Sequence, residues 1–151
     1  RQRQMCIRDS VNSVEVNVDG VLSSRGAALK ENYSDFPKYN TQLIVDKDSL
    51  NSIAKLLFEN SFQMNAVAFG DAANQTVLDT YNLFLSDSDD PRWRIEHINV
   101  ISKDDISKFN SKIIPSIQPS QAVSQMKWAR LRLGVERIKD AFKYKDYYSN
   151  I

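Results

Sequence analysis

The first side chain to consider for chemistry is that of His97, the single histidine of this sequence. One histidine, with no serine inside a Gly-x-Ser-x-Gly elbow, gives no support to Ser/His/Asp catalysis. The sequence also contains no glycine-rich phosphate-binding loop. Its one cysteine, Cys6, excludes a disulfide framework and a cysteine-rich zinc module.

Polar groups stand inside two runs that otherwise look like buried strands. Residues 14–18 (VEVNV) include Glu15, and residues 93–101 (WRIEHINVI) include Glu96 and His97. Because parallel sheets are normally covered on both faces, polar groups within such strands invite a functional explanation. Taken alone, Glu15 is more often a solvent-facing residue or an ion-pair partner, and His97 is more often a hydrogen-bonded core residue than a metal ligand.

The elements that must position these residues alternate along the chain. The predicted strands are 14–18, 62–69, 93–101 and 113–117. The predicted helices are 49–60, 72–85, a short one near 104–110, and 134–147. Asp48 and Asp71 stand where helix N-caps are expected, and a cap alone accounts for Asp71. Four alternations of strand and helix indicate βα units and a parallel sheet, so the predicted fold class is α/β.

Composition and charge exclude several functional classes. The 151 residues suffice for one domain with its own core. With 20 Lys+Arg against 19 Asp+Glu the formal net charge is +1, which gives no sign of a nucleic-acid partner. No apolar run approaches the roughly 20 residues that a membrane span needs. Glu136 and Asp140 interrupt the basic segment 127–145, so we interpret it as a solvated helix face rather than a nucleic-acid surface.

The first ten residues (RQRQMCIRDS) need separate treatment. They lack apolar periodicity and the zones of a secretory signal, and they resemble a translated sequencing-adaptor artefact; the alternative is a natural disordered leader. We therefore assign residues 1–10 to an artefact or leader and residues 11–151 to the folded domain. The location of the protein stays open because its true amino terminus is not in view, with the cytoplasm favoured.

Four segments, taken in order, carry a family resemblance. They are VDGVLSSRGAAL (18–29), SFQMNAVAFGDAANQTVLDTY (61–81), RWRIEHINVI (92–101) and SIQPSQAVSQMKWARLRLGVERIKDAF (116–142). Together they resemble the YtcJ-like branch of the amidohydrolase superfamily, amidohydrolase family 3 of the metal-dependent TIM-barrel hydrolases. The resemblance implies a partial (β/α)8 TIM barrel of about four βα units, corresponding to barrel strands four to seven. Such a piece lacks the first strand's His-x-His pair and the eighth strand's aspartate.

The resemblance also implies where metal ligands would stand. The family's carboxylated, metal-bridging lysine falls on Glu15, and its sixth-strand histidine is kept as His97. Its fifth-strand histidine falls on Val67, and the histidine of its QPxHxxSDM motif falls on Gln121. A catalytic zinc typically takes three protein ligands, and this chain offers at most Glu15 and His97. We therefore expect a divalent metal, zinc, in the intact parent and no metal bound by this chain alone.

Three functions follow as hypotheses, none with a catalytic residue assigned within this chain. In the first, the chain is a fragment of a metal-dependent amidohydrolase that uses metal-activated water to hydrolyse a non-peptide carbon-nitrogen bond in a small-molecule amide or cyclic amide. Arg25 would then bind an anionic substrate group, or else pair with a carboxylate. The second hypothesis is a degenerate, non-catalytic α/β scaffold that has lost the metal, and the third is a binding module without chemistry. In every case, exposed sheet edges predict self-association.

Overall fold

The structure, a computed structural model, describes residues 12–85 and 91–148. The segment 1–10 and the acidic stretch 86–90 lie outside the described residues. The strands are β1 (Ser13–Asn17), β2 (Gln63–Ala68), β3 (Trp93–His97) and β4 (Ile113–Ile117). The helical elements are α2 (Lys47–Glu59), α3 (Asp71–Leu85), α4 (Lys103–Ile106), α5 (Pro119–Arg137), the 3-10 turn η1 (Ile138–Asp140) and α6 (Tyr144–Tyr148).

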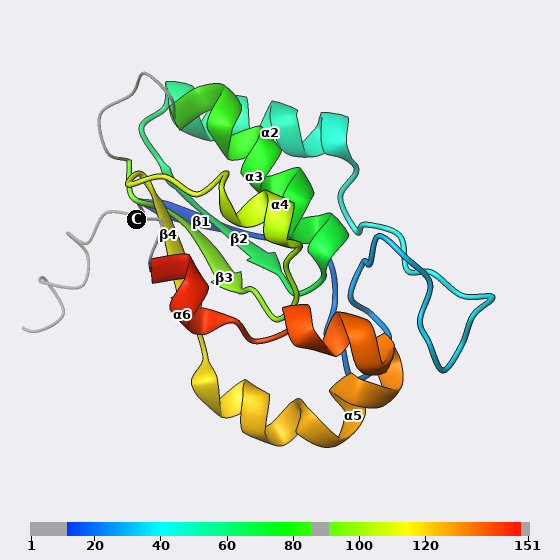
Figure 1. Ribbon diagram of the computed structural model, residues 1–151. Helices are drawn as coiled ribbons and strands as arrows, with labels where there is room; N and C mark the ends of the chain where they lie inside the picture. Colours follow the sequence, from blue (N-terminus) through cyan, green and yellow to red (C-terminus); the bar gives the residue numbers. More distant parts are fainter. Residues whose placement is uncertain (1–11, 86–90, 149–151) are drawn as a thin grey trace, which may run out of the picture.

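The four strands form one parallel sheet in the order β1-β2-β3-β4, so each strand lies beside its neighbour in sequence (Figure 1). The predicted α/β class with a parallel sheet is confirmed. The register places Glu15 of β1 level with Asn65 of β2, whereas His97 of β3 is level with Ala68. Since all four strands run in the same direction, their carboxyl ends lie together at one end of the sheet.

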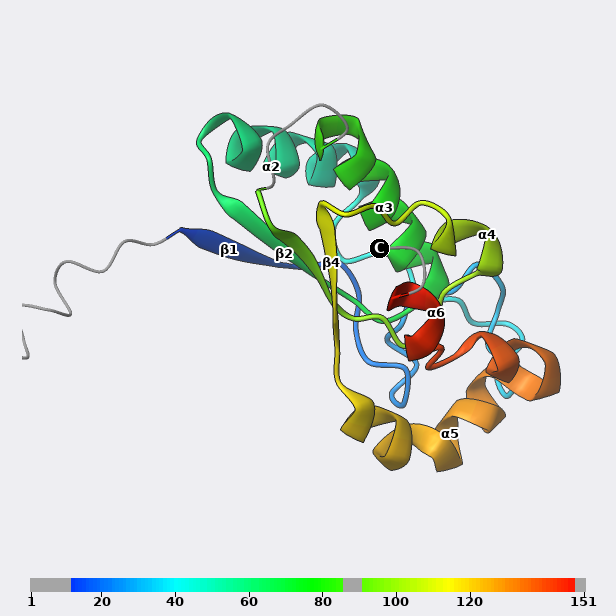
Figure 2. The same ribbon diagram turned by 60° about the vertical axis from the view of Figure 1, so that its left-hand side comes forward.

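Helices α2, α3 and α4 cover one face of the sheet, as Figure 2 shows. Alternate strand residues such as Val16, Met64 and Ile95 point into this layer and are buried in the main core cluster. Full burial of a side chain of this size stabilises the fold by about 1.5–3 kcal/mol. Most of the other alternate positions are polar; they include the exposed Glu15 and the ion pair of Arg94 with Glu96 at 2.8 Å. No helix in the described part of the chain is both long and apolar enough to span a membrane.

A second apolar cluster lies at the carboxyl ends of the strands. It joins Val67 and Phe69 from β2 and its following loop to Leu22 of the loop after β1 and to Ala129 and Leu133 of α5. Both figures place α5 beyond the strand ends rather than against the helical layer (Figures 1 and 2). The loop after β1 and α5 therefore cover the end of the sheet where parallel α/β proteins carry their chemistry.

Strand β3 ends at His97, four residues before the predicted boundary at residue 101. His97 and Ile98 have φ values of 79° and 43°, which turn the backbone out of the extended conformation. Helix α5 was not predicted over residues 119–133. Of its apolar residues, Ala129 is buried whereas Trp128 is exposed, so no continuous apolar stripe marks the helix in the sequence.

The predicted single helix over residues 134–147 is wrong. Gly134 has a φ of 76° and interrupts the helical path inside α5. After the short turn η1, Ala141 is extended, and α6 begins only at Tyr144. The predicted N-cap of α2 at Asp48 is also wrong, because the side chain of Asp46 accepts the hydrogen bonds from the amides of the first helical turn.

Candidate functional site

The carboxyl ends of β1 and β2 are joined by the buried carboxylate of Asp19, which is 2% exposed. Its oxygens accept hydrogen bonds from the backbone amides of Phe69 and Gly70, each at 2.8 Å, and of Ala28 at 2.9 Å. The sequence indicated only a turn at Asp19-Gly20. The side chain instead fixes the loop after β1 against the residues that follow β2, and this loop forms one wall of the candidate site.

Two opposing effects set the protonation of Asp19. Burial raises the pKa of its carboxyl group, and the hydrogen bonds from Phe69, Gly70 and Ala28 lower it. The net result is a pKa raised from 3.8 to about 7. Asp19 therefore changes charge near neutral pH at the point where the loop meets the sheet.

His97 lies at the carboxyl end of β3 and is held from two sides. Its ring stacks on Phe69 with a centroid distance of 4.5 Å and an interplanar angle of 12°. Its Nδ1 lies 2.9 Å from Nε2 of Gln121, in the first turns of α5. The positive φ of His97 takes its side chain out of the alternation of β3 and places the ring beside Phe69.

Several amide side chains lie along the start of α5 and just after β3. Nε2 of Gln121 also donates to Oε1 of Gln118 at 2.9 Å. One turn further along α5, Gln125 accepts a hydrogen bond from the fully buried Asn99 at 3.3 Å. Two oxygens of this cluster, Asn99 Oδ1 and Gln121 Oε1, are buried and have no hydrogen-bond partner among the described residues. The end of β3 is thus an amide-rich environment.

The structure does not bring Glu15 and His97 together. Glu15 is exposed in the middle of β1, level with Asn65, whereas His97 is level with Ala68, three residues nearer the carboxyl end. With β2 between them, their Cα atoms are offset by about 10 Å across the sheet and about 10 Å along it. Two donors on one zinc ion lie only about 3–4 Å apart, so these two side chains do not form a common site in this geometry.

Comparison with known proteins assigns the family. A model of the amidohydrolase family matches residues 4–149, nearly the whole chain. The chain belongs to the amidohydrolase family. Among curated proteins it is similar to Protein LONG AFTER FAR-RED 3 of Arabidopsis thaliana, at 27% identity over 139 residues, and to the putative amidohydrolase YtcJ of Bacillus subtilis strain 168, at 28% identity over 138 residues.

These matches cover 89% and 91% of this amidohydrolase-family chain but only 24% and 26% of the two relatives. The chain thus spans about a quarter of the length of the curated relatives that it matches. Two crystal structures of uncharacterized metal-dependent hydrolases are also similar, each with a TM-score of 0.80 over 90% of this chain. The protein from Pyrococcus horikoshii OT3 is 28% identical and that from Pyrococcus furiosus 29%, and the chain covers 27% and 28% of them. The expected likeness to a YtcJ-like amidohydrolase and to part of its barrel is confirmed.

The metal implied by the family does not fit the donors that this chain provides. Among residues 12–85 and 91–148, no group of three or more His, Cys, Asp or Glu side chains is placed to hold a metal ion. Val67, where the family places a histidine, is 6% exposed and packs in the apolar cluster with Phe69. The described residues therefore do not form a zinc centre with three protein ligands.

Arg25, the predicted substrate-binding residue of this amidohydrolase-family chain, is engaged with a carboxylate. Its Nε and Nη2 donate to the two oxygens of Asp35 at 3.2 and 2.9 Å, and its guanidinium lies 5.7 Å from the ring centroid of Phe36. Arg132 of α5 also binds Asp35. Although burial acts to raise it, these two arginines lower the pKa of Asp35. Arg25 thus forms an ion pair with a carboxylate, which is one of the two interpretations that the sequence left open.

The predicted N-cap role of Asp71 is wrong, because Asp71 lies inside α3 and its side chain accepts from neither the second nor the third amide of the helix among the contacts of the described residues. Asp71 is the first residue of α3, and its Oδ1 accepts hydrogen bonds from the backbone amides of Ala72 at 3.1 Å and Lys30 at 3.0 Å. Burial raises the pKa of Asp71, and the hydrogen bond from Lys30 lowers it. These contacts account for Asp71 without a catalytic role.

Sequence reasoning missed the buried amides of the site. Asn74, on α3, is fully buried and donates to the carbonyl oxygens of Gly70 at 2.9 Å and Val100 at 3.0 Å, which ties α3 to the loops after β2 and β3. Asn99 was placed inside a predicted strand. Their only sequence signal is an amide within an otherwise apolar pattern, because their partners come from distant segments.

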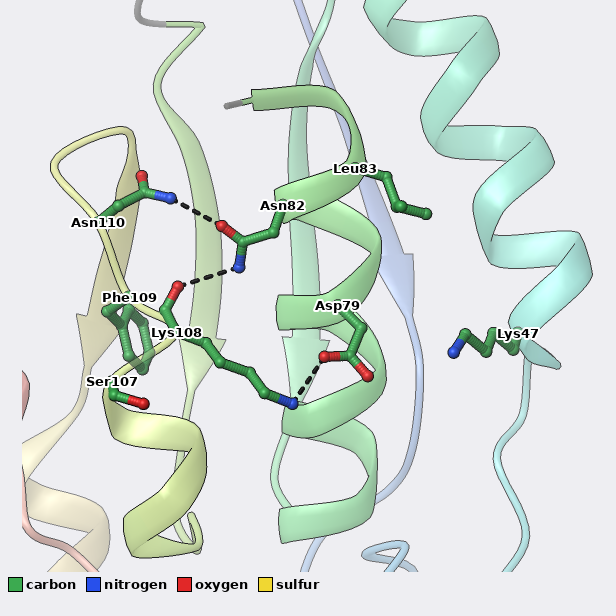
Figure 3. A pocket seen from close by; sticks show the side chains of 8 residues that line it. All are labelled: Lys47, Asp79, Asn82, Leu83, Ser107, Lys108, Phe109 and Asn110. Atoms are coloured by element: carbon green, nitrogen blue, oxygen red, sulfur yellow. Dashed lines mark hydrogen bonds and ion pairs between the residues drawn. The ribbon is translucent and has the colours of Figure 1, made fainter. Parts of the chain in front are cut away.

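A cavity of about 580 Å³ lies elsewhere, on the helical layer between α2, α3 and residues 107–110 (Figure 3). Lys108 on its wall is paired with Asp79 at 2.7 Å, and Asn82 bonds both Asn110 and the carbonyl oxygen of Lys108. Asp79, Asn82, Lys108 and Asn110 thus pair with one another, and none of the lining residues belongs to the site at the end of β3.

Proposed function

We propose that this chain is one portion of a larger amidohydrolase barrel that hydrolyses a non-peptide carbon-nitrogen bond in a small-molecule amide or cyclic amide. Support comes from family membership, from the similarity to metal-dependent hydrolases, and from the share of about a quarter that the chain covers in its relatives. The observation that carries the proposal is the position of His97 at the carboxyl end of a parallel strand, where barrel hydrolases gather their reactive groups.

A divalent metal, for which zinc is our proposal, supplies activated water and polarises a carbonyl group when it is bound in such barrels. The donors of this chain do not complete that centre, so its ligands would come largely from strands outside this chain. Within the chain, Asp19 holds the loop after β1 against β2, and Phe69 holds the imidazole of His97. The local role of these residues is to shape the end of the barrel that faces the substrate.

A second candidate is a degenerate scaffold that keeps the family fold without metal chemistry. Two observations favour it: Val67 presents an apolar side chain where the family has a histidine, and Gln121 presents an amide where it has another. A protein of this kind would bind neither zinc nor a substrate through a metal.

The two candidates differ in metal content. The test is to purify the protein encoded by the reading frame that contains this chain, load it with zinc, and measure zinc per chain together with amine or ammonia release from a panel of amides. The hydrolase proposal predicts at least one zinc per chain and hydrolysis that stops on chelation. Less than about a tenth of an equivalent, with no release, would support the scaffold. A His97→Ala variant of the same protein reports whether this imidazole contributes.

We further propose that the 151-residue chain self-associates when isolated. Within the described residues β1 pairs only with β2 and β4 only with β3, so both edges of the sheet present unpaired backbone groups. Light scattering should therefore report a mass above 17.3 kDa. A stable, cooperatively folded monomer would contradict this proposal.

A further inference from the structure

The imidazole of His97 is held in one orientation by its own backbone and by Phe69. His97 and Ile98 both have φ values in the left-handed region, at 79° and 43°. Non-glycine residues keep such conformations only when their surroundings hold them, and these conformations cluster at functional sites. The stacked ring of Phe69, at 4.5 Å and 12°, then fixes the plane of the imidazole.

Gln121 fixes which ring nitrogen carries the proton. Its Nε2 lies 2.9 Å from Nδ1 of His97 and 2.9 Å from Oε1 of Gln118. An amide nitrogen has two hydrogens to donate and accepts none, so each hydrogen is directed at one of these two atoms. With the amide in this orientation and the ring neutral, Nδ1 is the acceptor and the hydrogen resides on Nε2.

The opposite orientation of the Gln121 amide is less favourable. It would bring Oε1 of Gln121 to the position 2.9 Å from Oε1 of Gln118, where two acceptors repel each other.

We propose that Gln121 is a positioning residue that holds His97 in the Nε2–H form, so that the imidazole at the end of β3 donates a hydrogen bond to a ligand oxygen instead of binding metal. Histidines that ligate metals donate through their other ring nitrogen to a carboxylate, carbonyl oxygen or water, whereas Gln121 offers Nδ1 a donor. A neutral imidazole N–H can polarise a carbonyl group. This inference rests on the proposed function only in taking the end of β3 as the substrate-facing end.

The single histidine makes the proposal directly testable by NMR. The chain is labelled with [15N]histidine, and a long-range 1H–15N spectrum is recorded at about pH 8, where an ordinary imidazole is neutral. All imidazole signals then belong to His97. The wild-type chain should show the pattern of the Nε2–H tautomer.

Gln121→Glu supplies a carboxylate, which can only accept, and should move the proton to Nδ1. The matched control is Gln125→Glu, the same chemical change one turn later on α5, at a residue that contacts Asn99 and not His97. The control should keep the Nε2–H pattern. Because this proton shift frees Nε2 of His97, the Gln121→Glu variant should also bind Zn²⁺ at least about tenfold more tightly than the wild type or the control.

An Nδ1–H tautomer in the wild-type chain would overturn the proposal, and so would an unchanged Nε2–H pattern in Gln121→Glu. Circular dichroism checks that the variants fold. If Gln121→Glu does not, Gln121→Asn, which keeps the amide but shortens its reach, should lose the single-tautomer pattern. The tautomer is measured independently of hydrolysis. If the parent protein proves metal-free and inactive but its His97 carries the proton on Nε2, the proposed function is wrong and this inference is still supported.

Discussion

Oδ2 of Asp19 accepts a hydrogen bond from the backbone amide of Gly70 at 2.8 Å, so the end of β1 is tied directly to the end of β2, 51 residues later in the chain. The same carboxylate binds the amides of Phe69 and Ala28. Since Phe69 stacks on His97, the position of the imidazole depends on this buried carboxylate.

Asp19→Ala should destabilise the chain by at least about 3 kcal/mol. The substitution leaves three buried N–H groups without their acceptor, and each such loss costs roughly 1–3 kcal/mol. Urea unfolding at neutral pH measures the change. Asp104→Ala, at an exposed position, is the control and should cost less than about 1 kcal/mol. Equal effects from the two substitutions would contradict this role of Asp19.

The raised pKa of Asp19 predicts a specific pH dependence of stability. With a folded-state pKa of about 7 and an unfolded-state pKa near 4, the folded chain binds the proton more tightly. This contribution to the free energy of unfolding is complete below about pH 4 and is lost as the pH rises through about 7.

Asp19→Asn cannot titrate and resembles the protonated form. The free energy of unfolding of the wild type minus that of the variant should therefore fall between about pH 4 and 7, by up to about 4 kcal/mol. Denaturant titrations of both proteins across this range provide the measurement. A difference that rises with pH would contradict this prediction, because it would mean that the three amide hydrogen bonds lower the pKa of Asp19 by more than burial raises it.

Gly70→Ala tests the close approach of two loops. A Cβ at this position would lie 2.0 Å from the carbonyl oxygen of Ala28, so the loop after β1 would have to move. We expect a loss of at least about 3 kcal/mol, measured by thermal unfolding. Gly134→Ala meets the strain of a φ of 76° with a ψ of −177° and the Oγ of Ser34 at 2.8 Å, a side chain that can move, so it should cost about 1–3 kcal/mol, less than Gly70→Ala. Comparable losses in the two variants would contradict the contact between Gly70 and Ala28.

Arg25 and Arg132 share Asp35 but should differ in their contribution to stability. The Arg25 side chain is 34% exposed, and its loss in Arg25→Met should cost less than about 1 kcal/mol. Arg132 is 12% exposed and also donates to the carbonyl oxygen of Ser23, so Arg132→Met should cost more. Urea unfolding of the two variants gives the order, and a larger cost for Arg25→Met would contradict the greater contribution expected of the more buried Arg132.

The sheet could be predicted from the sequence because its strands have a strong local pattern. Residues 113–117 form β4 with the predicted bounds, and β1 differs by one residue at each end. Helix α5 escaped prediction since it packs through few residues, among them Ala129 and Leu133, one turn apart. Hydrophobic periodicity therefore predicts an element that buries a wide face, such as a strand of the sheet, and fails to predict one that buries a narrow face, such as α5.

The candidate site could be predicted only in part. The family motifs drew attention to His97, but nothing local in the sequence shows that its φ is positive or that Gln121 faces its Nδ1. Likewise, the acceptor role of Asp19 depends on amides about 50 residues away. The expected pairing of Glu15 with His97 assumed neighbouring positions, and the strand register offsets them by three residues.

The most direct test of the account is the zinc stoichiometry of the 151-residue chain, measured by equilibrium dialysis at micromolar free Zn²⁺ and elemental analysis. With Glu15 and His97 far apart and no three-donor group among the described residues, we predict less than about a tenth of an equivalent. One tightly held equivalent that disappears in both Glu15→Ala and His97→Ala would contradict it.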